Sequence, residues 1–386
     1  MADEFKDIRP YNEEEFPQVL RKLTRNDYLI TLLRTLRWPN LAPFLKKPAD
    51  FLTSRFIRHR LRSIKTIDQF QRQIIMGQLI AWVIEKTTSG LSVSGLEHLK
   101  KDQSYIFISN HRDIVLDVCF INHFLVHAGF GITQIAIGDN LLINEFISDL
   151  MRANKSFIVK RNLPPRDQIQ ASIQLSRYIH KTLEEGESIW IAQREGRAKD
   201  GQDLTNPAVI KMLYLAKRKS RRDFTEFIRE CHIVPVVISY ELDPCDTIKG
   251  WELHHVQTRG YHEKRKYEDL LSIVAGIKGK KGRVHLSFGK PLSGTYNNDR
   301  EVATEIDLWM SRNYQIWPSN YIAWDEIHGS EAYKDYYTEE ERQAFLSRFR
   351  RQFEPVRRLI LEIYARSVEN IRPRDEEMDP GDSGGS

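Results

Sequence analysis

Between residues 105 and 288 the sequence alternates between short apolar runs and longer segments with helical periodicity. Six runs have the length and composition of buried strands, at 105–108, 132–137, 156–159, 188–192, 233–239 and 284–288. Helical patterns separate them at about 114–128, 141–152, 167–185 and 207–229. This alternation predicts an α/β fold with a largely parallel central sheet flanked by helices.

Four regions are expected along the 386 residues. Residues 1–90 have apolar positions at helical intervals and predict a helical region, and residues 91–295 hold the α/β domain. Residues 296–372 predict a helical C-terminal extension, in which Thr338 and Glu341 form a capping box. The tail 373–386 is acidic and then rich in glycine and serine, which predicts disorder. Within the α/β domain, the glycine- and lysine-rich segment 276–283 is expected to be a flexible basic loop.

The net charge of +5 is concentrated in one stretch of the chain. From Arg34 to Lys65 there are nine basic residues and one acid, Asp50, and apolar residues such as Phe51 and Phe56 are interleaved with them. This mixture favours an anionic membrane surface as the partner. A plain solvated face and a nucleic-acid surface are the alternatives.

No apolar stretch reaches the ~18 residues typical of a membrane span. The first residues also lack the basic and then apolar pattern of a secretory signal. The three cysteines, Cys119, Cys231 and Cys245, have no metal-like spacing, and reduced thiols are the simplest account of them. We therefore expect a cytoplasmic protein that is peripheral on the inner face of the membrane.

A histidine follows the first strand candidate. Ser109 and Asn110 end the apolar run, His111 comes next, and Asp117 follows six positions later. Side chains at the carboxyl end of a strand lie where α/β sheets build their sites. If the next segment is helical, Asp117 lies between one and two turns on and could reach back to the imidazole. Such a carboxylate would make His111 a general base near neutral pH, although a His-x5-Asp pattern also arises by chance.

The residues around this pair suggest what a base could act on. No serine or cysteine nucleophile motif lies beside it, which suggests that a substrate hydroxyl attacks an activated acyl group. Two later strand candidates are followed by cations, Lys160 with Arg161 and Arg194 with Arg197. Cations at this edge suggest a phosphorylated substrate, whereas each one taken singly fits a surface loop. No histidine has a carboxylate or cysteine at a metal-ligand spacing, and no metal site is predicted.

Four blocks in order resemble the signature of glycerolipid acyltransferases, a family that includes glycerol-3-phosphate and 1-acylglycerol-3-phosphate acyltransferases. The blocks are Asn110-His111 with Asp117, Phe157 to Arg161, Glu195-Gly196-Arg197, and Val234-Pro235-Val236. The segment 283–291 is similar to the one that closes the family's domain, so the resemblance covers about 95–292. The chain departs from the pattern in three places: the gap from His111 to Asp117 is one residue longer, a residue is lacking between Gly196 and Arg197, and Asn154 stands where glycine is common. Because of the longer gap, Asp113 is the alternative partner of His111.

The resemblance implies that His111 deprotonates an acceptor hydroxyl, which attacks the thioester of acyl-CoA or acyl carrier protein, and that Asp117 orients His111. It implies that the acceptor's phosphate is held by Lys160, Arg161 and Arg197. It further implies that Glu195 and Gly196 shape the acceptor loop and that Val234 and Pro235 line or position the acyl channel. The expected acceptor is glycerol-3-phosphate or 1-acylglycerol-3-phosphate, with no cofactor and no metal.

Two other functions remain open from the sequence. The acceptor could be another lysolipid or an amino-acid lipid, in which case activity would persist without an acceptor phosphate. Alternatively, the chain could be a non-catalytic module that binds lipid or nucleic acid through the Arg34–Lys65 stretch.

Overall fold

The computed structural model describes residues 3–370 except Pro39, Asn162, 218–222 and 264–267. The tail 373–386, for which the sequence predicts disorder, lies outside the described residues. The chain forms two compact units, unit 1 from residues 1–80 and 131–189 and unit 2 from residues 81–130 and 190–386. The four regions expected from the sequence stay predictions.

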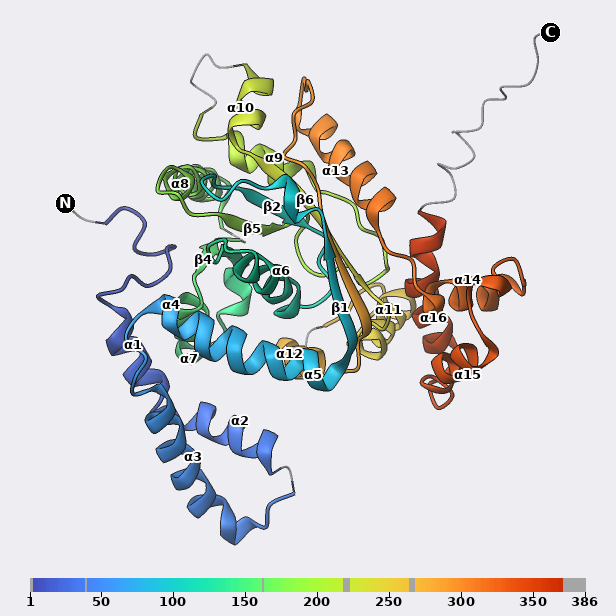
Figure 1. Cartoon of the computed structure of the whole chain (residues 1–386), viewed down its shortest axis with the longest axis horizontal. Helices are drawn as coiled ribbons and strands as arrows, with labels where there is room; N and C mark the ends of the chain where they lie inside the picture. Colours follow the sequence, from blue (N-terminus) through green and yellow to red (C-terminus); the bar gives the residue numbers. More distant parts are fainter. Residues whose placement is uncertain (1–2, 39, 162, 218–222, 264–267, 371–386) are drawn as a thin grey trace. The chain divides into compact units, whose positions relative to one another are not determined.

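The fold is α/β, as predicted. Its strands are β1 (Thr88–Ser94), β2 (Ile106–Ser109), β3 (Gln134–Gly138), β4 (Ser156–Val159), β5 (Ile189–Ala192), β6 (Ile233–Tyr240) and β7 (Gly282–Phe288), hydrogen-bonded in the order β1-β7-β6-β2-β5-β3-β4 (Figure 1). The pairs β1/β7, β2/β6 and β3/β4 are parallel, and β6/β7 is antiparallel. All six strand candidates are present, each within two residues of its expected ends. The sequence missed only β1 among the described strands, because its Thr-Ser-Gly start and largely exposed side chains lack an apolar pattern.

Unit 1 is mainly helical outside its two strands. Its helices are α1 (Phe16–Leu23), α2 (Asp27–Arg37), η1 (Pro43–Leu45), α3 (Lys46–Leu61), α4 (Ile67–Gln69), the π-helical η2 (Phe70–Ile80), η4 (Asp139–Leu141), α7 (Glu145–Ala153) and α8 (Pro165–Glu184). Phe16, Val19 and Leu23 recur at helical spacing on α1 and are buried in one cluster with Phe70 and Phe146 of η2 and α7. The N-terminal region is therefore helical, as the periodicity predicts.

Helices cover the strands of unit 2 on both faces. Its helices are α5 (Ala81–Thr87), η3 (Leu96–His98), α6 (Leu116–His127), α9 (Pro207–Tyr214), α10 (Phe224–Glu230), α11 (Asp246–Arg259), α12 (Glu268–Lys278), α13 (Asp299–Asn313), α14 (Pro318–His328), η5 (Lys334–Tyr336), α15 (Glu339–Ser347) and α16 (Glu354–Glu369). Alternate residues of a strand point to opposite faces of the sheet. Accordingly Tyr240 of β6 lies against Phe120 of α6, with ring centroids 6.2 Å apart, whereas Ser239 accepts a hydrogen bond from the backbone of Gln315 just after α13.

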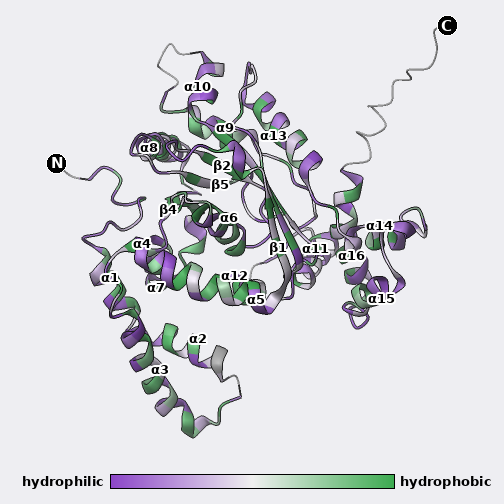
Figure 2. Cartoon of the chain, in the orientation of Figure 1, coloured by the Kyte–Doolittle hydropathy of each residue, from purple (hydrophilic) through white to green (hydrophobic). Residues whose placement is uncertain are grey.

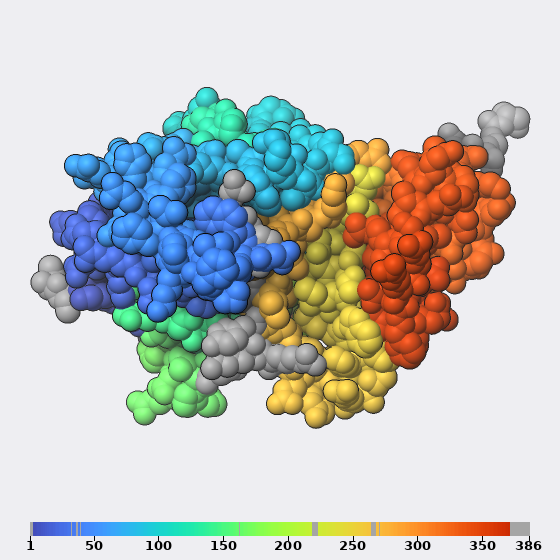
Figure 3. Space-filling model, turned by 90° about the horizontal axis from the view of Figure 1, so that it is seen from below, coloured from blue at the N-terminus to red at the C-terminus, as the bar shows by residue number. Residues whose placement is uncertain are grey.

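The C-terminal helices α14, α15 and α16 form a second hydrophobic cluster of unit 2. They lie beside α11, as the orange-to-red and yellow surfaces in Figure 3 show. A Cβ atom at Gly250 of α11 would come within 2.6 Å of Ile360 Cγ1 on α16, so this close packing requires glycine. The predicted capping box is also present, since Thr338 Oγ1 accepts from Glu341 N at 3.2 Å and Glu341 Oε2 accepts from Thr338 N at 2.9 Å.

The prediction of a flexible basic loop at 276–283 is wrong. Residues up to Lys278 belong to α12, and Lys281 is fully buried. Its ammonium donates to Thr87 Oγ1 at 2.9 Å and to the Gly279 carbonyl at 2.7 Å. Burial lowers the pKa of Lys281 to about 8 from its ordinary 10.5. The sequence shows the charges of this segment but not the acceptors that allow one of them to be buried.

Lys281 should make the stability of the chain depend on pH. Between pH 8 and 10.5 the folded chain has released this proton while the unfolded chain still holds it, so stability should rise with pH in that window. We expect the Tm of the wild type, measured relative to Lys281→Met, to increase from pH 7.5 to pH 10. Below pH 8 both states hold the proton and the difference should be constant. A Tm difference that stays flat across the whole range would contradict the assignment.

Candidate active site

The strand β2 ends in a side chain that continues its hydrogen bonding. Asn110 is fully buried, its Oδ1 accepts from the Ile238 amide of β6 at 2.8 Å, and its Nδ2 donates to the Ile238 carbonyl at 3.0 Å. The side chain thereby occupies the position of a further peptide in the ladder. This fixes where the chain leaves the sheet, and the next residue is His111.

His111 and Asp117 are brought together. His111 Nδ1 lies 2.8 Å from Asp117 Oδ2, and the imidazole side chain is 13% exposed while the carboxylate is completely buried. Trp190 of β5 contacts the imidazole edge-on, with ring centroids 5.5 Å apart. The contact that the sequence anticipated is therefore present, with Asp117 in the first turn of α6.

The extra residue between His111 and Asp117 is absorbed by a turn that Asp113 stabilises. Asp113 Oδ1 accepts from the backbone amides of Val115 and Leu116 at 2.9 and 2.8 Å, which is the hydrogen bonding of a helix N-cap. Its other oxygen lies toward Gly276 of α12, where an added Cβ would come within 2.0 Å. Burial, and then the nearby Asp117, raise the pKa of Asp113. Asp113 thus shapes the loop, and Asp117 is the carboxylate at the imidazole.

Both carboxylate oxygens of Asp117 accept hydrogen bonds. Besides the imidazole, Oδ2 accepts from the amides of Arg112 and Asp113 at 2.6 and 2.9 Å, and Oδ1 accepts from the Tyr240 hydroxyl at 2.8 Å. Burial raises the pKa of Tyr240 well above its ordinary value, so the phenol keeps its proton and donates it. The two amides and the hydroxyl are three donors that stabilise an ionised carboxylate. Tyr240 was not found from the sequence, because 123 residues separate it from Asp117.

This hydrogen bonding assigns the tautomer of His111. An ionised carboxylate can only accept, so Nδ1 carries the proton and Nε2 keeps its lone pair. Within the described part of the chain, Nε2 makes no hydrogen bond. The geometry is therefore that of a general base whose proton acceptor is Nε2.

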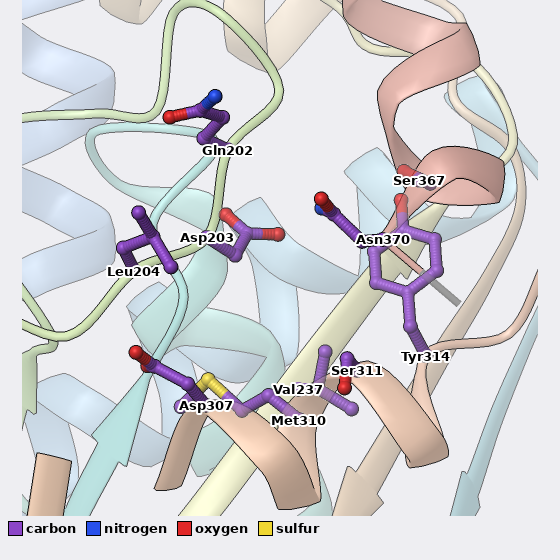
Figure 4. Close-up of a pocket in the computed structure, with 10 residues that line it drawn as sticks. All are labelled: Gln202, Asp203, Leu204, Val237, Asp307, Met310, Ser311, Tyr314, Ser367 and Asn370. Atoms are coloured by element: carbon purple, nitrogen blue, oxygen red, sulfur yellow. The ribbon is translucent and has the colours of Figure 1, made fainter. Parts of the chain in front are cut away.

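A second carboxylate, Asp203, holds the residues on either side of His111. Its Oδ2 accepts from Asn110 Nδ2 at 3.2 Å and from Arg112 Nη2 at 2.6 Å, while its Oδ1 is buried without a hydrogen bond. Asp203 lines a cavity of about 150 Å³ and points across it toward Tyr314 and Asn370 (Figure 4). His111 is not among the residues that line this cavity. No sequence pattern points to Asp203, which lies 93 residues beyond Asn110.

The loop after β5, which contains the third block, Glu195-Gly196-Arg197, contacts His111 through its backbone. The Ala198 amide donates to the His111 carbonyl at 2.7 Å, which places the loop after β5 next to the base. Gly196 has φ +72°, a left-handed conformation that favours glycine, and Glu195 is exposed. The Arg197 side chain is only 6% exposed, and its Nη2 donates to Ser272 Oγ of α12 at 3.4 Å. Arg197 therefore points into unit 2.

The remaining predicted residues lie in two places. Val234 and Pro235 are fully buried in β6, with Pro235 opposite Ile108 of β2. Lys160 and Arg161 follow β4 in unit 1: Lys160 forms an ion pair with Asp7, and the Arg161 amide donates to Asp139 Oδ2 at 3.1 Å. The roles of these four residues in binding the acyl chain or the phosphate stay predictions.

One group of possible metal ligands lies together among the described residues, formed by Glu252, His262 and Glu268. Its members already have partners. His262 Nε2 lies 2.8 Å from Glu268 Oε1, and Glu252 forms an ion pair with Lys199. An ammonium on the buried carboxylate argues against a divalent cation there, and the geometry therefore does not support a metal centre.

Comparison with known proteins shows what the chain is similar to. The family model described as Acyltransferase matches residues 90–239. The chain is 25% identical over 218 residues to a glycerol-3-phosphate acyltransferase of Pseudomonas paraeruginosa and 27% identical over 225 residues to a probable mitochondrial glycerol-3-phosphate acyltransferase of Caenorhabditis elegans. Each match covers 55% of this chain, but only 24% and 28% of the relative, so the chain spans about a quarter of their length.

A solved structure is also similar. The 1-acyl-sn-glycerophosphate acyltransferase PlsC from Thermotoga maritima aligns with 74% of this chain and 95% of its own, at 14% identity and a TM-score of 0.38. The family match contains all four sequence blocks, including His111, Asp117 and Arg197. Residues 90–239 are thus similar to the acyltransferase family model, and the chain is similar to glycerol-3-phosphate acyltransferases over 55% of its length.

Proposed function

We propose that the chain transfers a fatty acyl group from a thioester, acyl-CoA or acyl carrier protein, to a hydroxyl of glycerol-3-phosphate or 1-acylglycerol-3-phosphate. The observation that carries this proposal is the imidazole with Nδ1–H bound to a fully buried, ionised Asp117 and Nε2 left to act as a base. The names of the relatives support a phosphorylated glycerol as the acceptor. Lys160, Arg161 and Arg197 are the cations proposed to hold its phosphate.

The reaction follows from the tautomer. His111 Nε2 takes the hydroxyl proton of the acceptor while the hydroxyl oxygen attacks the thioester carbonyl carbon. The tetrahedral intermediate collapses with cleavage of the C–S bond, and the imidazolium returns the proton to the departing thiolate. Asp117 stabilises the imidazolium in between, and Tyr240 fixes the carboxylate that does so. The thioester supplies the activation of the acyl group, so the proposed chemistry calls for no protein nucleophile.

A panel of acceptors tests this function. The full chain is incubated with long-chain acyl-CoA or acyl carrier protein and, in turn, glycerol-3-phosphate, 1-acylglycerol-3-phosphate, a lysophosphatidylcholine and a lyso amino-acid lipid. We expect acyl transfer to a phosphate monoester to dominate. Transfer only to acceptors without a phosphate monoester would favour the alternative acyltransferase, and vesicle binding without transfer to any acceptor would favour a non-catalytic lipid-binding module.

We further propose that α3 places the chain on an anionic membrane. Apolar residues of η1 and α3 are exposed, Phe44 by 79%, Phe51 by 63%, Leu52 by 59% and Phe56 by 63%. The exposed cations around them are Lys46, Lys47, Arg55, Arg58, Arg60 and Arg62, and Figure 2 shows apolar and polar residues mixed along this helix. Exposed aromatic rings beside cations are typical of interfacial helices. Arg34 is not part of this surface, because it is 8% exposed and paired with Asp50 at 2.6 Å.

No helix among the described residues has both the length and the apolar character needed to cross a bilayer. Attachment through α3 would therefore be interfacial.

Removing two of these rings should weaken binding to vesicles. In Phe51→Ser/Phe56→Ser, two large exposed apolar groups can no longer enter the headgroup region, and each contributes roughly 1.5–3 kcal/mol when fully buried. We expect the partition onto vesicles with 30% anionic lipid, measured by sedimentation, to fall at least about tenfold. Phe353→Ser removes a 55% exposed ring from unit 2 and is the matched control. Equal binding by the double variant and the control would contradict attachment through α3.

A further inference from the structure

Glu252 of α11 is a buried carboxylate placed between two cations of the loop after β5. Its Oε1 lies 4.0 Å from Arg197 Nη2, and its Oε2 forms an ion pair with Lys199 Nζ. The side chains of Glu252 and Arg197 are 4% and 6% exposed. Figure 3 shows the yellow surface of α11, the helix that carries Glu252, at the exterior of unit 2.

These charges are paired but poorly hydrogen-bonded. Oε1 of Glu252 and Nη1 of Arg197 are buried without a hydrogen bond among the described residues, whereas Oε2 of Glu252 contacts the Lys199 ammonium. Buried charged groups are costly unless they are paired and hydrogen-bonded. A guanidinium presents five N–H donors in a planar fork that matches the oxygens of a phosphate. The arrangement therefore leaves unused a hydrogen-bonding capacity that an oxyanion with more oxygens would satisfy.

The same loop is part of the candidate active site. Ala198 lies between the two cations in the sequence, and its amide donates to the His111 carbonyl at 2.7 Å. Arg197 also acts electrostatically on Asp113, whose pKa it lowers against the larger effect of burial. Glu252 thus neutralises the cations on either side of Ala198, in a loop whose backbone contacts His111.

We propose that Glu252 is a specificity-determining residue, whose carboxylate occupies the site at Arg197 and Lys199 that the phosphate of the acceptor takes during the reaction. The inference rests on the proposed function, since it assumes that Arg197 binds this phosphate. A phosphate monoester carries close to two negative charges and three free oxygens, so it can displace a singly charged carboxylate. A phosphodiester or a carboxylate has one charge and no such advantage. Glu252 would therefore select acceptors with a terminal phosphate monoester.

The experiment compares the wild type with Glu252→Gln. Without phosphate, the variant should melt at a lower temperature than the wild type, because two buried or half-buried cations lose their counter-charge. Inorganic phosphate should then raise the Tm of the variant more than that of the wild type, since binding to the folded state stabilises it. The KM for glycerol-3-phosphate should fall about tenfold at unchanged kcat. The preference for the phosphate monoester over a lysophosphodiester should weaken.

Asp200→Asn is the matched control. Asp200 lies in the same loop but pairs with Arg194, at 3.2 Å, so its removal should leave the phosphate response and the KM as in the wild type. Glu252→Asp keeps the charge on a shorter side chain that reaches the two cations less well. Its phosphate response is expected to lie between those of Glu252→Gln and the wild type, which provides a second test if Glu252→Gln does not fold.

Two results would overturn the proposal. One is a folded Glu252→Gln whose Tm responds to phosphate as the wild type does. The other is an unchanged or increased KM for the phosphate monoester, which would leave Glu252 with a merely structural role. Failure of the proposed function looks different: no variant and no wild-type protein would transfer acyl groups to any acceptor, yet the difference in phosphate response would persist.

Discussion

Replacing His111 by alanine should reduce acyl transfer from a long-chain thioester by roughly 10²–10⁴-fold or more. The alanine removes the Nε2 lone pair that takes the hydroxyl proton, and no other histidine touches Asp117 among the described residues. The effect should be on kcat, because the groups proposed to hold the acceptor are untouched. Initial rates with acyl-CoA and the best acceptor of the panel, at saturating concentrations, provide the measurement.

His127→Ala is the control for this experiment. His127 lies on the same helix, α6, but is exposed; its Nδ1 lies 2.7 Å from the His123 carbonyl, and the two imidazole ring centroids are 4.2 Å apart. The rate of acyl transfer by His127→Ala should equal that of the wild type. A correctly folded His111→Ala with an unchanged rate would remove the basis of the proposed chemistry.

Asp117→Asn should reduce kcat by about 10²–10³-fold, within the range attributed to positioned acid–base groups. The amide oxygen should take the place of Oδ2, since that place is surrounded by three N–H donors, and the amide NH₂ should face the Tyr240 hydroxyl. Nδ1 of His111 would keep its proton and its acceptor, so the tautomer would survive. What is lost is the negative charge that stabilises the imidazolium, and the kcat–pH profile should shift accordingly toward a weaker base.

Asp325→Asn provides a closely matched control. Asp325 is also a buried carboxylate of unit 2 that accepts from a tyrosine hydroxyl, Tyr337 at 2.9 Å, and from a backbone amide, Tyr333 at 3.2 Å. Its substitution should lower the Tm without changing the rate per folded molecule. If the two variants lose stability in parallel and both keep full kcat, Asp117 has no part in catalysis.

The sequence could predict features that depend on neighbouring residues. Apolar runs bounded by turn residues located six strands, because a strand buried on both faces needs nearly every side chain to be apolar. The pairing of His111 with Asp117 was also within reach, since both lie within one loop and one helical turn. The α/β fold follows from such local patterns.

Features that depend on distant residues could not be predicted. Tyr240 and Asp203 reach the site across the sheet, and nothing in their own surroundings in the sequence distinguishes them from other polar residues. Asp113 stays an alternative to Asp117 in the sequence, because the choice depends on the turn before α6, where Asp113 accepts from the amides of Val115 and Leu116. Glu252 lies on α11, a helix whose mixture of charged, aromatic and histidine residues lacks a clear apolar face, and the segment was left unassigned.

Asp203 binds the side chains of both residues that flank His111. This affects the activation barrier of the proposed reaction. The side chains of Asn110 and Arg112, on either side of the imidazole in the sequence, are tied to one carboxylate, so the ring's surroundings cannot relax far when it gains a positive charge. Dipoles that are already oriented toward a developing charge contribute little reorganisation energy at the moment of proton transfer. The conformational entropy needed to preorganise this base is thus lost once, when the chain folds, rather than in each catalytic cycle.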